Sequence, residues 1–232
     1  MPDSPWVMTQ TWNDLLFAHW PIDPRELDGR VPAAFPIDLF EGQAWIGIVP
    51  FHMTNVAPRG LPSLPWVSQF PELNVRTYVC VDDRPGVFFF SLDAGSPVAV
   101  HAARALLNLP YYAAAMTVTT AAGGVQYHSA RKAHTEAVFE GFYAPAGPPS
   151  LPVPGSLAHF LTERYCLYNL DHRGNPYRME IHHPPWPLQT AHAQWTRNTM
   201  AAVNGIRLPN RPPLLHFSRR QDMVAWAPAR VG

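Results

Sequence analysis

Three side chains suited to binding or activating a small acid alternate along one short segment, Glu72, Asn74 and Arg76. A guanidinium binds carboxylates, an amide hydrogen-bonds carbonyl groups, and a carboxylate can take up a proton. If residues 70–83, FPELNVRTYVCVDD, form a strand, alternation places all three on one face. That face also receives Tyr78 and Cys80, and the opposite face carries Leu73, Val75, Val79 and Val81.

The polar face of this strand has two interpretations. In a strongly curved or closed sheet it would line an internal pocket. Arg76 would then be largely buried and face the cavity, accompanied by the Glu72 carboxylate, because an isolated buried charge is costly. In an open sheet the same face would meet solvent, with Glu72 and Arg76 as diagonal partners. The pattern alone leaves both interpretations open.

Two consecutive tyrosines, Tyr111 and Tyr112, follow Pro110 at the start of another predicted strand. Alternation directs them to opposite faces, so one is expected in the core while the other points its hydroxyl into a cavity. A buried hydroxyl requires a hydrogen-bond partner, and Arg76 or Glu72 would serve if the strands are neighbours. The pattern does not decide which tyrosine faces the pocket.

Other chemistry finds little support in the sequence. The eleven histidines form no HExxH motif and no Cys/His cluster with metal-ligand spacing, although His134 and Glu136 share a face. His182 and His183 are adjacent and would point in opposite directions in an extended segment. A Gly-rich phosphate loop and a G-x-S-x-G motif are also missing. We therefore expect no metal and no cofactor.

Composition narrows the class of protein. The 232 residues are 47 % hydrophobic and 15 % charged with a formal net charge of zero, which is typical of a folded protein without affinity for nucleic acid or anionic membranes. The length suits one domain over residues 1–232. With neither a signal peptide nor an apolar stretch of about 18 residues, we expect a cytoplasmic protein without a membrane span.

The elements that must position these residues are mostly strands. Runs rich in aromatic and β-branched residues predict strands over residues 43–56, 72–81, 86–94, 113–121, 136–144 and 222–231. Proline clusters mark loops at residues 57–66, 144–156, 182–188 and 208–215. The spacing predicts an antiparallel sheet that curls or closes on itself.

Helix signals are few. Ser96 as a cap, Pro97 in the first turn and Pro110 as a stop predict a helix over residues 96–110. We interpret Asp93 and Ser96 as helix-start residues rather than catalytic ones. Shorter helices are predicted over residues 155–165 and 196–206.

Seven segments together carry a family resemblance. PWVMTQTWNDLLFAHWPI, AWIGIVPFHMTN, FPELNVRTYV, FFFSLDA, LPYYAAAM, FLTERYCLY and EIHHPPWPL resemble the uncharacterised bacterial YqjF-like family, within the acetoacetate decarboxylase-like superfamily. The resemblance covers nearly the whole chain. It implies a large, curved, mainly antiparallel sheet forming a cone or barrel around a pocket, with a few helices outside.

The resemblance also implies where the site lies. Acetoacetate decarboxylase has a helix ending in Gly-hydrophobic-Pro-Lys-Lys, whose first lysine forms a Schiff base and whose second depresses the pKa of the first. Here Tyr111 and Tyr112 stand at the lysine positions, and a phenol cannot form an imine. The chain's one lysine, Lys132, is expected on the surface. Glu72 is the best match to a pocket glutamate of the decarboxylase.

Three functions are consistent with these residues. The first is binding of a small carboxylate- or carbonyl-containing molecule by Glu72, Asn74, Arg76, Tyr111 and Tyr112. The second is an enzyme in which a tyrosine is the acid and Glu72 the base, without an imine. The third is an interaction protein that binds its partner through the exposed loops LPSLPW (61–66) and HHPPWPL (182–188). The sequence leaves open whether copies of the chain associate.

Overall fold

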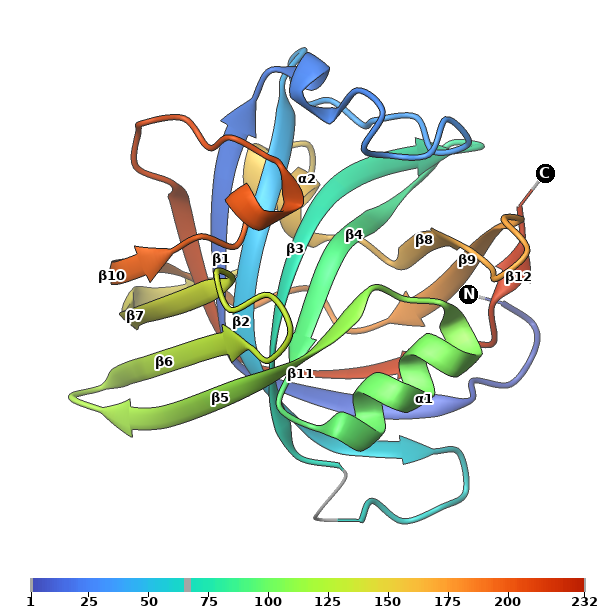
Figure 1. Cartoon of the computed structure of the whole chain (residues 1–232), viewed down its shortest axis with the longest axis horizontal. Helices are drawn as coiled ribbons and strands as arrows, with labels where there is room; N and C mark the ends of the chain where they lie inside the picture. Colours follow the sequence, from blue (N-terminus) through green and yellow to red (C-terminus); the bar gives the residue numbers. More distant parts are fainter. Residues whose placement is uncertain (1, 65–67, 232) are drawn as a thin grey trace.

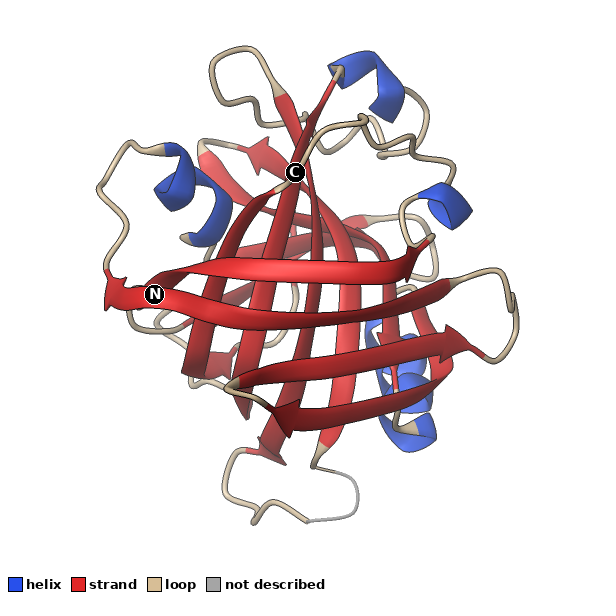
Figure 2. Ribbon diagram, turned by 90° about the vertical axis from the view of Figure 1, so that its left-hand side faces the viewer, coloured by secondary structure: helices blue, strands red, loops and turns tan. Residues whose placement is uncertain are grey.

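A single twelve-stranded sheet makes up most of the molecule (Figures 1 and 2). The computed structural model describes residues 2–64 and 68–231. The strands are β1 (Met8–Ile22), β2 (Ala44–Pro58), β3 (Phe70–Val81), β4 (Arg84–Ala94), β5 (Tyr111–Ala121), β6 (Gly124–Arg131), β7 (Val138–Ser150), β8 (Cys166–Leu170), β9 (Pro176–His182), β10 (Leu188–Asn198), β11 (Leu214–Ala225) and β12 (Ala229–Arg230). The helices are α1 (Pro97–Leu107) and α2 (Leu157–Thr162), with 3-10 turns η1 (Pro24–Leu27) and η2 (Ala202–Asn204).

The sheet closes on itself twice. Its strand order is β12-β9-β8-β4-β3-β2-β1-β11-β10-β7-β6-β5, and two further pairings, β4–β5 and β9–β11, join strands that are distant in this order. The β4–β5 pairing closes a larger ring that runs through β10, β7 and β6. The β9–β11 pairing closes a smaller ring that runs through β8 and β4. Strands β1 to β4 and β11 belong to both rings.

The prediction of a large curved sheet is confirmed, with one refinement. The sheet is mixed, because β4 pairs in parallel with both β5 and β8. All remaining pairings between the described strands are antiparallel. The first part of β4 pairs with β8, which belongs to the smaller ring. Its last residues pair with β5, which belongs to the larger ring.

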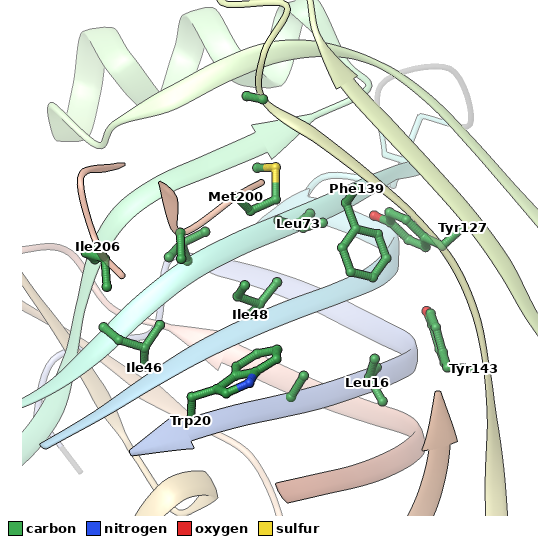
Figure 3. Packing of buried hydrophobic residues seen from close by; sticks show 14 of the residues in the cluster. Leu16, Trp20, Ile46, Ile48, Leu73, Tyr127, Phe139, Tyr143, Met200 and Ile206 are labelled. Carbon is green, nitrogen blue, oxygen red and sulfur yellow. The ribbon is translucent and has the colours of Figure 1, made fainter. Parts of the chain in front are cut away.

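The larger ring is filled by the main hydrophobic core (Figure 3). Leu16, Ile48 and Leu73 reach this core from the shared strands, and Tyr127 and Phe139 reach it from β6 and β7. The alternate residues of the shared strands point into the smaller ring. Much of β1, β2 and β4 is therefore buried on both faces and has near-continuous apolar sequence rather than alternation. β3 instead turns polar side chains to the smaller ring, and β11 exposes Arg219, Arg220 and Asp222.

One strand that the sequence did not predict, β1, follows from this arrangement. β1 is buried without interruption from Leu15 to Ile22, so it shows no alternating pattern. β6, β8, β9 and β10 were likewise missed. The predicted strand over residues 222–231 is wrong in its bounds, because β11 ends at Ala225 and only Ala229–Arg230 pairs again.

Two of the three predicted helices form. In α1 the Ser96 hydroxyl accepts the Ala99 N–H at 3.3 Å, and Asn108 ends the helix in the left-handed conformation. In α2, the Ser156 hydroxyl accepts the His159 N–H in the same way. No helix in the described parts of the chain is long and apolar enough to cross a membrane.

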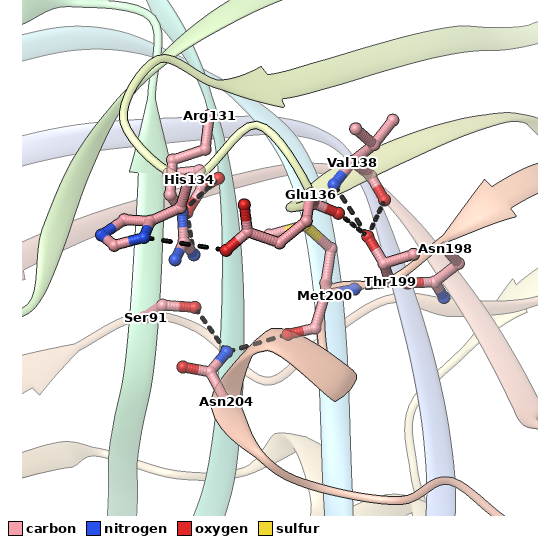
Figure 4. A network of polar contacts seen from close by, with 10 residues as sticks. Ser91, Arg131, His134, Glu136, Val138, Asn198, Thr199, Met200 and Asn204 are labelled. Atoms are coloured by element: carbon pink, nitrogen blue, oxygen red, sulfur yellow. Dashed lines mark hydrogen bonds and ion pairs between the residues drawn. The ribbon is translucent and has the colours of Figure 1, made fainter.

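The third predicted helix, over residues 196–206, is wrong. Arg197 and Asn198 pair with β7 as the last residues of β10, and only the 3-10 turn η2 forms afterwards. The Asn204 amide of this turn donates to the Ser91 hydroxyl of β4 at 3.0 Å, which fixes the turn against the larger ring (Figure 4). A side chain from a distant strand thus replaces the helix-stabilising contacts that the local sequence suggested.

Candidate functional site

A cavity of about 270 Å³ occupies the smaller ring. Strands β1, β2, β3, β4, β8, β9 and β11 contribute to its wall, and α1 covers one side (Figure 1). Its surface is largely apolar and includes the aromatic side chains of Trp12, Phe17, Phe51, Phe70 and Trp186. A cavity needs only about 10–15 Å³ for one water molecule, so this one is large enough for an organic ligand.

The alternation of β3 separates the packed core from the cavity. Leu73 and Val75 pack in the core of the larger ring. Glu72, Asn74 and Arg76 line the cavity. Both faces of the strand are therefore internal, and the solvent-facing interpretation of its polar face is wrong.

Glu72 and Tyr111 form one polar contact of the cavity wall. The Tyr111 hydroxyl donates to Glu72 Oε2 at 2.7 Å. Burial raises the pKa of Glu72 to about 7, although the hydrogen bond from Tyr111 and the neighbouring Asn74 amide act in the opposite direction. Burial and the Glu72 carboxyl raise the pKa of Tyr111 well above its ordinary value, so Tyr111 remains a proton donor. Glu72 can therefore exchange a proton near neutral pH beside a fixed hydroxyl donor.

Tyr112 points to the other side of its strand. Its ring lies against Arg131, with 3.8 Å between the guanidinium carbon and the ring centroid. Arg131 and Asp93 form a buried ion pair at 2.7 Å. Tyr111 is thus the tyrosine that faces the cavity, and Tyr112 is not part of it. The interpretation of Asp93 as a helix-start residue is wrong, because its carboxylate is fully buried against Arg131.

Arg76 lacks the carboxylate partner that the sequence suggested. No ion pair joins it to any residue of 2–64 or 68–231, and Glu72 is bonded to Tyr111 instead. Four residues of strand separate Arg76 from Glu72, about 13 Å at 3.3 Å per residue. The Arg76 guanidinium lies 5.5 Å from the Phe17 ring centroid, and one nitrogen is 3.4 Å from the Leu161 carbonyl oxygen. Its Nε is buried with no hydrogen-bond partner. Arg76 is half-buried rather than largely buried.

A buried histidine lies next to Arg76. His19 Nε2 is 2.6 Å from the Tyr78 hydroxyl, and its Nδ1 has no partner. Burial, together with the charge of Arg76, lowers the pKa of His19 well below its ordinary value. Gly47 makes room for this arrangement, since a Cβ there would lie 3.2 Å from the His19 ring and 3.3 Å from Arg76 Cγ. His19 is neutral and does not compensate the charge of Arg76.

The sequence did not identify two further polar residues of the cavity wall. Arg164 lines the cavity and is ion-paired with Asp38 at 2.5 Å. His183 is buried against Tyr165, with 4.7 Å between ring centroids, and burial lowers its pKa. His182 is exposed, so the two adjacent histidines do point apart. The segments that carry these residues show no local pattern that distinguishes cavity from core.

The proposed docking loops have different outcomes. Trp186 of HHPPWPL is only 2 % exposed and lines the cavity, so this loop does not offer an exposed aromatic surface. The loop LPSLPW includes residues 65 and 66, which lie outside the described residues. Lys132 is exposed, in the turn after β6, and is not in the cavity wall.

The sequence is similar to one protein family and to one bacterial protein over most of its length. A family described as an uncharacterised conserved protein, DUF2071, matches residues 9–222. The uncharacterised protein YqjF of Bacillus subtilis is 45% identical over 226 residues, covering 97% of this chain and 93% of that protein.

Solved structures of low sequence identity share the fold. Acetoacetate decarboxylase from Legionella pneumophila superposes with a TM-score of 0.68 at 10% identity, covering 100% of this chain and 92% of that one. The enduracididine biosynthesis enzyme MppR, complexed with pyruvate, gives 0.67 at 10% identity, with the same coverage of 100% and 92%. An acetoacetate decarboxylase-like enzyme from Sphingomonas wittichii gives 0.64 at 12% identity, covering 98% and 94%. The chain has the acetoacetate decarboxylase-like fold and belongs to the DUF2071 family.

Proposed function

We propose that the protein binds a small organic molecule carrying a carboxylate or carbonyl group in the cavity of the smaller ring. The observation that carries the proposal is Arg76, a guanidinium in a largely apolar wall with no ion-pair partner among the described residues. An unpaired charge in such surroundings is unfavourable. A ligand carboxylate would supply the missing partner with charge-assisted hydrogen bonds.

The other polar atoms of the wall support the same function. Asn74 is 4 % exposed, and its Oδ1 has no hydrogen-bond partner. An amide oxygen only accepts hydrogen bonds, so a ligand hydroxyl beside the carboxylate or carbonyl group would satisfy it, and a buried acceptor left unsatisfied costs about 1–3 kcal/mol. Tyr111 and Glu72 can hold a carbonyl or hydroxyl group further along the wall. Binding would be non-covalent, because Lys132 lies outside the cavity.

An enzymatic function is a second candidate, and Glu72 favours it. A carboxyl group with a pKa of about 7 can serve as a general base near neutral pH, and Tyr111 can donate a proton or hydrogen bond to the same substrate. Enolisation, hydration or decarboxylation of a keto acid would need only these groups. The structurally similar MppR, solved with pyruvate, binds a molecule of this class.

Calorimetry and thermal-shift assays with butanoate, pyruvate and acetoacetate test the binding proposal. Arg76→Met should abolish binding while leaving the melting temperature nearly unchanged, because no ion pair is lost. Arg25→Met is the matched control, since Arg25 is 85% exposed and pairs only with Asp23. Binding that survives Arg76→Met would show that Arg76 does not hold the ligand, and a sharply destabilised variant would show that Arg76 is structural.

Product analysis by NMR separates the binder from the enzyme. An enzyme consumes the keto acid, and Glu72→Gln should stop consumption while the acid still binds. If acids bind and none is consumed, the protein is a binder.

A further inference from the structure

The polar and apolar parts of the cavity lie on opposite walls. In the smaller ring β3 is separated from both β9 and β11 by the intervening strands on either side, so the β9–β11 seam faces it. Glu72, Asn74 and Arg76 line the β3 wall. The seam contributes Met179 of β9 and Met223 of β11, both buried. A ligand in this cavity therefore meets hydrogen-bonding groups along one edge and mainly hydrocarbon along the other, where His183, directly after β9, is the polar exception.

The two ends of the cavity also differ. At the α2 end, Arg76 and Arg164 lie 5.7 and 5.1 Å from the ring centroid of Tyr78, and Arg76 contacts the Leu161 carbonyl of α2. Arg164 is already neutralised by Asp38, which leaves Arg76 as the cationic group available to an anion. Figure 1 shows α2 and α1 in opposite halves of the molecule.

The α1 end reaches the surface and is apolar along the helix itself. The Glu72–Tyr111 pair lies near the start of α1, because Glu72 is opposite Ala94 in the sheet. The side chains of Ala102, Ala103 and Leu106 line the cavity there, and Leu106 is 78% exposed. Of the seven methionines in the chain, four lie in the cavity wall: Met8, Met53, Met179 and Met223. Methionine is flexible and polarisable, so such a wall adapts to hydrocarbon groups of different shapes.

We propose that the ligand is an amphipathic monocarboxylic acid, bound with its carboxylate on Arg76 and its hydrocarbon or aryl tail directed toward α1. This inference rests on the binding function proposed above. A second carboxylate on the ligand would meet the apolar tail end or the buried Glu72 carboxyl, so dicarboxylates are disfavoured. Because the cavity opens beside Leu106, a tail longer than the cavity can emerge into solvent, and affinity should reach a plateau with chain length.

Calorimetry with acetate, butanoate, hexanoate and octanoate tests the tail. We expect up to about fourfold tighter binding for each methylene buried, until the plateau. Octanol and octylamine test the head group and should bind about tenfold or more weakly than octanoate, because they lack the charge-assisted contact with Arg76.

Two substitutions on α1 locate the tail. Ala103→Phe places a ring in the tail end and should remove the advantage of octanoate over butanoate without changing butanoate binding. Ala105→Phe is the control, because Ala105 is exposed on the same helix and does not line the cavity. Circular dichroism establishes that both variants fold. The chain-length series uses the wild-type protein, so it decides the question even if Ala103→Phe is unstable.

The outcomes distinguish this inference from the function on which it rests. If short acids bind as tightly as octanoate, or if folded Ala103→Phe keeps the octanoate advantage, the amphipathic ligand is refuted while the binding function stands. If octanol binds as tightly as octanoate, the carboxylate is not the recognised group and the inference is also refuted. If no acid of any length binds the folded wild-type protein, the binding function itself fails.

Discussion

Replacing Glu72 with glutamine should stabilise the protein at neutral and alkaline pH and have less effect under acidic conditions. Burial raises the pKa of Glu72 from 4.5 to about 7 in the folded chain. A folded-state pKa above the unfolded value means that the folded protein binds more protons between these two pH values. The stability that the folded protein gains from keeping Glu72 protonated is therefore complete below pH 4.5 and is lost as the pH rises through 7.

The shift sets the size of the effect. At 1.36 kcal/mol per pKa unit, a shift from 4.5 to about 7 corresponds to about 3 kcal/mol of lost stability once Glu72 is ionised. Glutamine keeps an acceptor oxygen for the Tyr111 hydroxyl and never ionises. The advantage of Glu72→Gln over the wild type should therefore grow by up to about 3 kcal/mol from below pH 4.5 to above pH 7, equivalent to about 6–12 °C in melting temperature for a chain of this size.

Urea unfolding of both proteins across this pH range measures the difference directly. Other groups titrate in both proteins and cancel when one curve is subtracted from the other. Glu140→Gln is the matched control, because it makes the same substitution at an exposed position away from the cavity. A stability difference between Glu72→Gln and wild type that does not vary with pH would refute the reasoning, since it would mean that Glu72 has the same pKa in the folded and unfolded chains.

Three further predictions concern other parts of the chain. Arg131→Met should destabilise the fold by about 3–5 kcal/mol in urea unfolding, because it leaves the Asp93 carboxylate buried without a partner; a loss below 1 kcal/mol would contradict the buried pair. Ser96→Ala should cost about 1 kcal/mol by removing the cap of α1, with faster amide exchange in that helix, and unchanged exchange would argue against the cap. Borohydride treatment with acetoacetate or pyruvate should give no adduct, because Lys132 is exposed and outside the cavity; mass spectrometry that finds a reduced adduct on Lys132 would restore an imine mechanism.

The strands with an alternating pattern could be predicted from sequence, and one of them also indicated part of the candidate site. In β3 the polar residues Glu72, Asn74 and Arg76 alternate with apolar ones, so their common face was evident before the structure. The sequence offered both Arg76 and Glu72 as partners for a tyrosine hydroxyl and did not decide between them. The contact of Glu72 with Tyr111 rather than Arg76 depends on β5 lying alongside β4, a parallel pairing with no local sequence signal.

The rest of the site depends on the closure of the smaller ring. Met8, Met179 and Met223 come from three strands far apart in sequence and meet only because β9 pairs with β11. Each methionine by itself is an ordinary core residue. His183 and Trp186 come from a proline-rich segment whose composition indicates an exposed loop, yet both are buried. The proline content of such a segment indicates its backbone conformation, but it does not indicate whether its other side chains are exposed or buried.

The shared strands explain how a protein can keep an unpaired guanidinium inside its fold. Leu73 and Val75 anchor β3 in the packed core of the larger ring, where truncating a large side chain typically costs about 2–5 kcal/mol. Asn74 and Arg76, on the opposite face of the same strand, line the cavity. Because one face packs in the core of the larger ring and the other lines the cavity, polar groups of the cavity can remain unsatisfied without unfolding the strand that carries them. If the proposed binding function holds, the same separation would let substitutions in the cavity wall change the ligand preference while the core of the larger ring stays fixed.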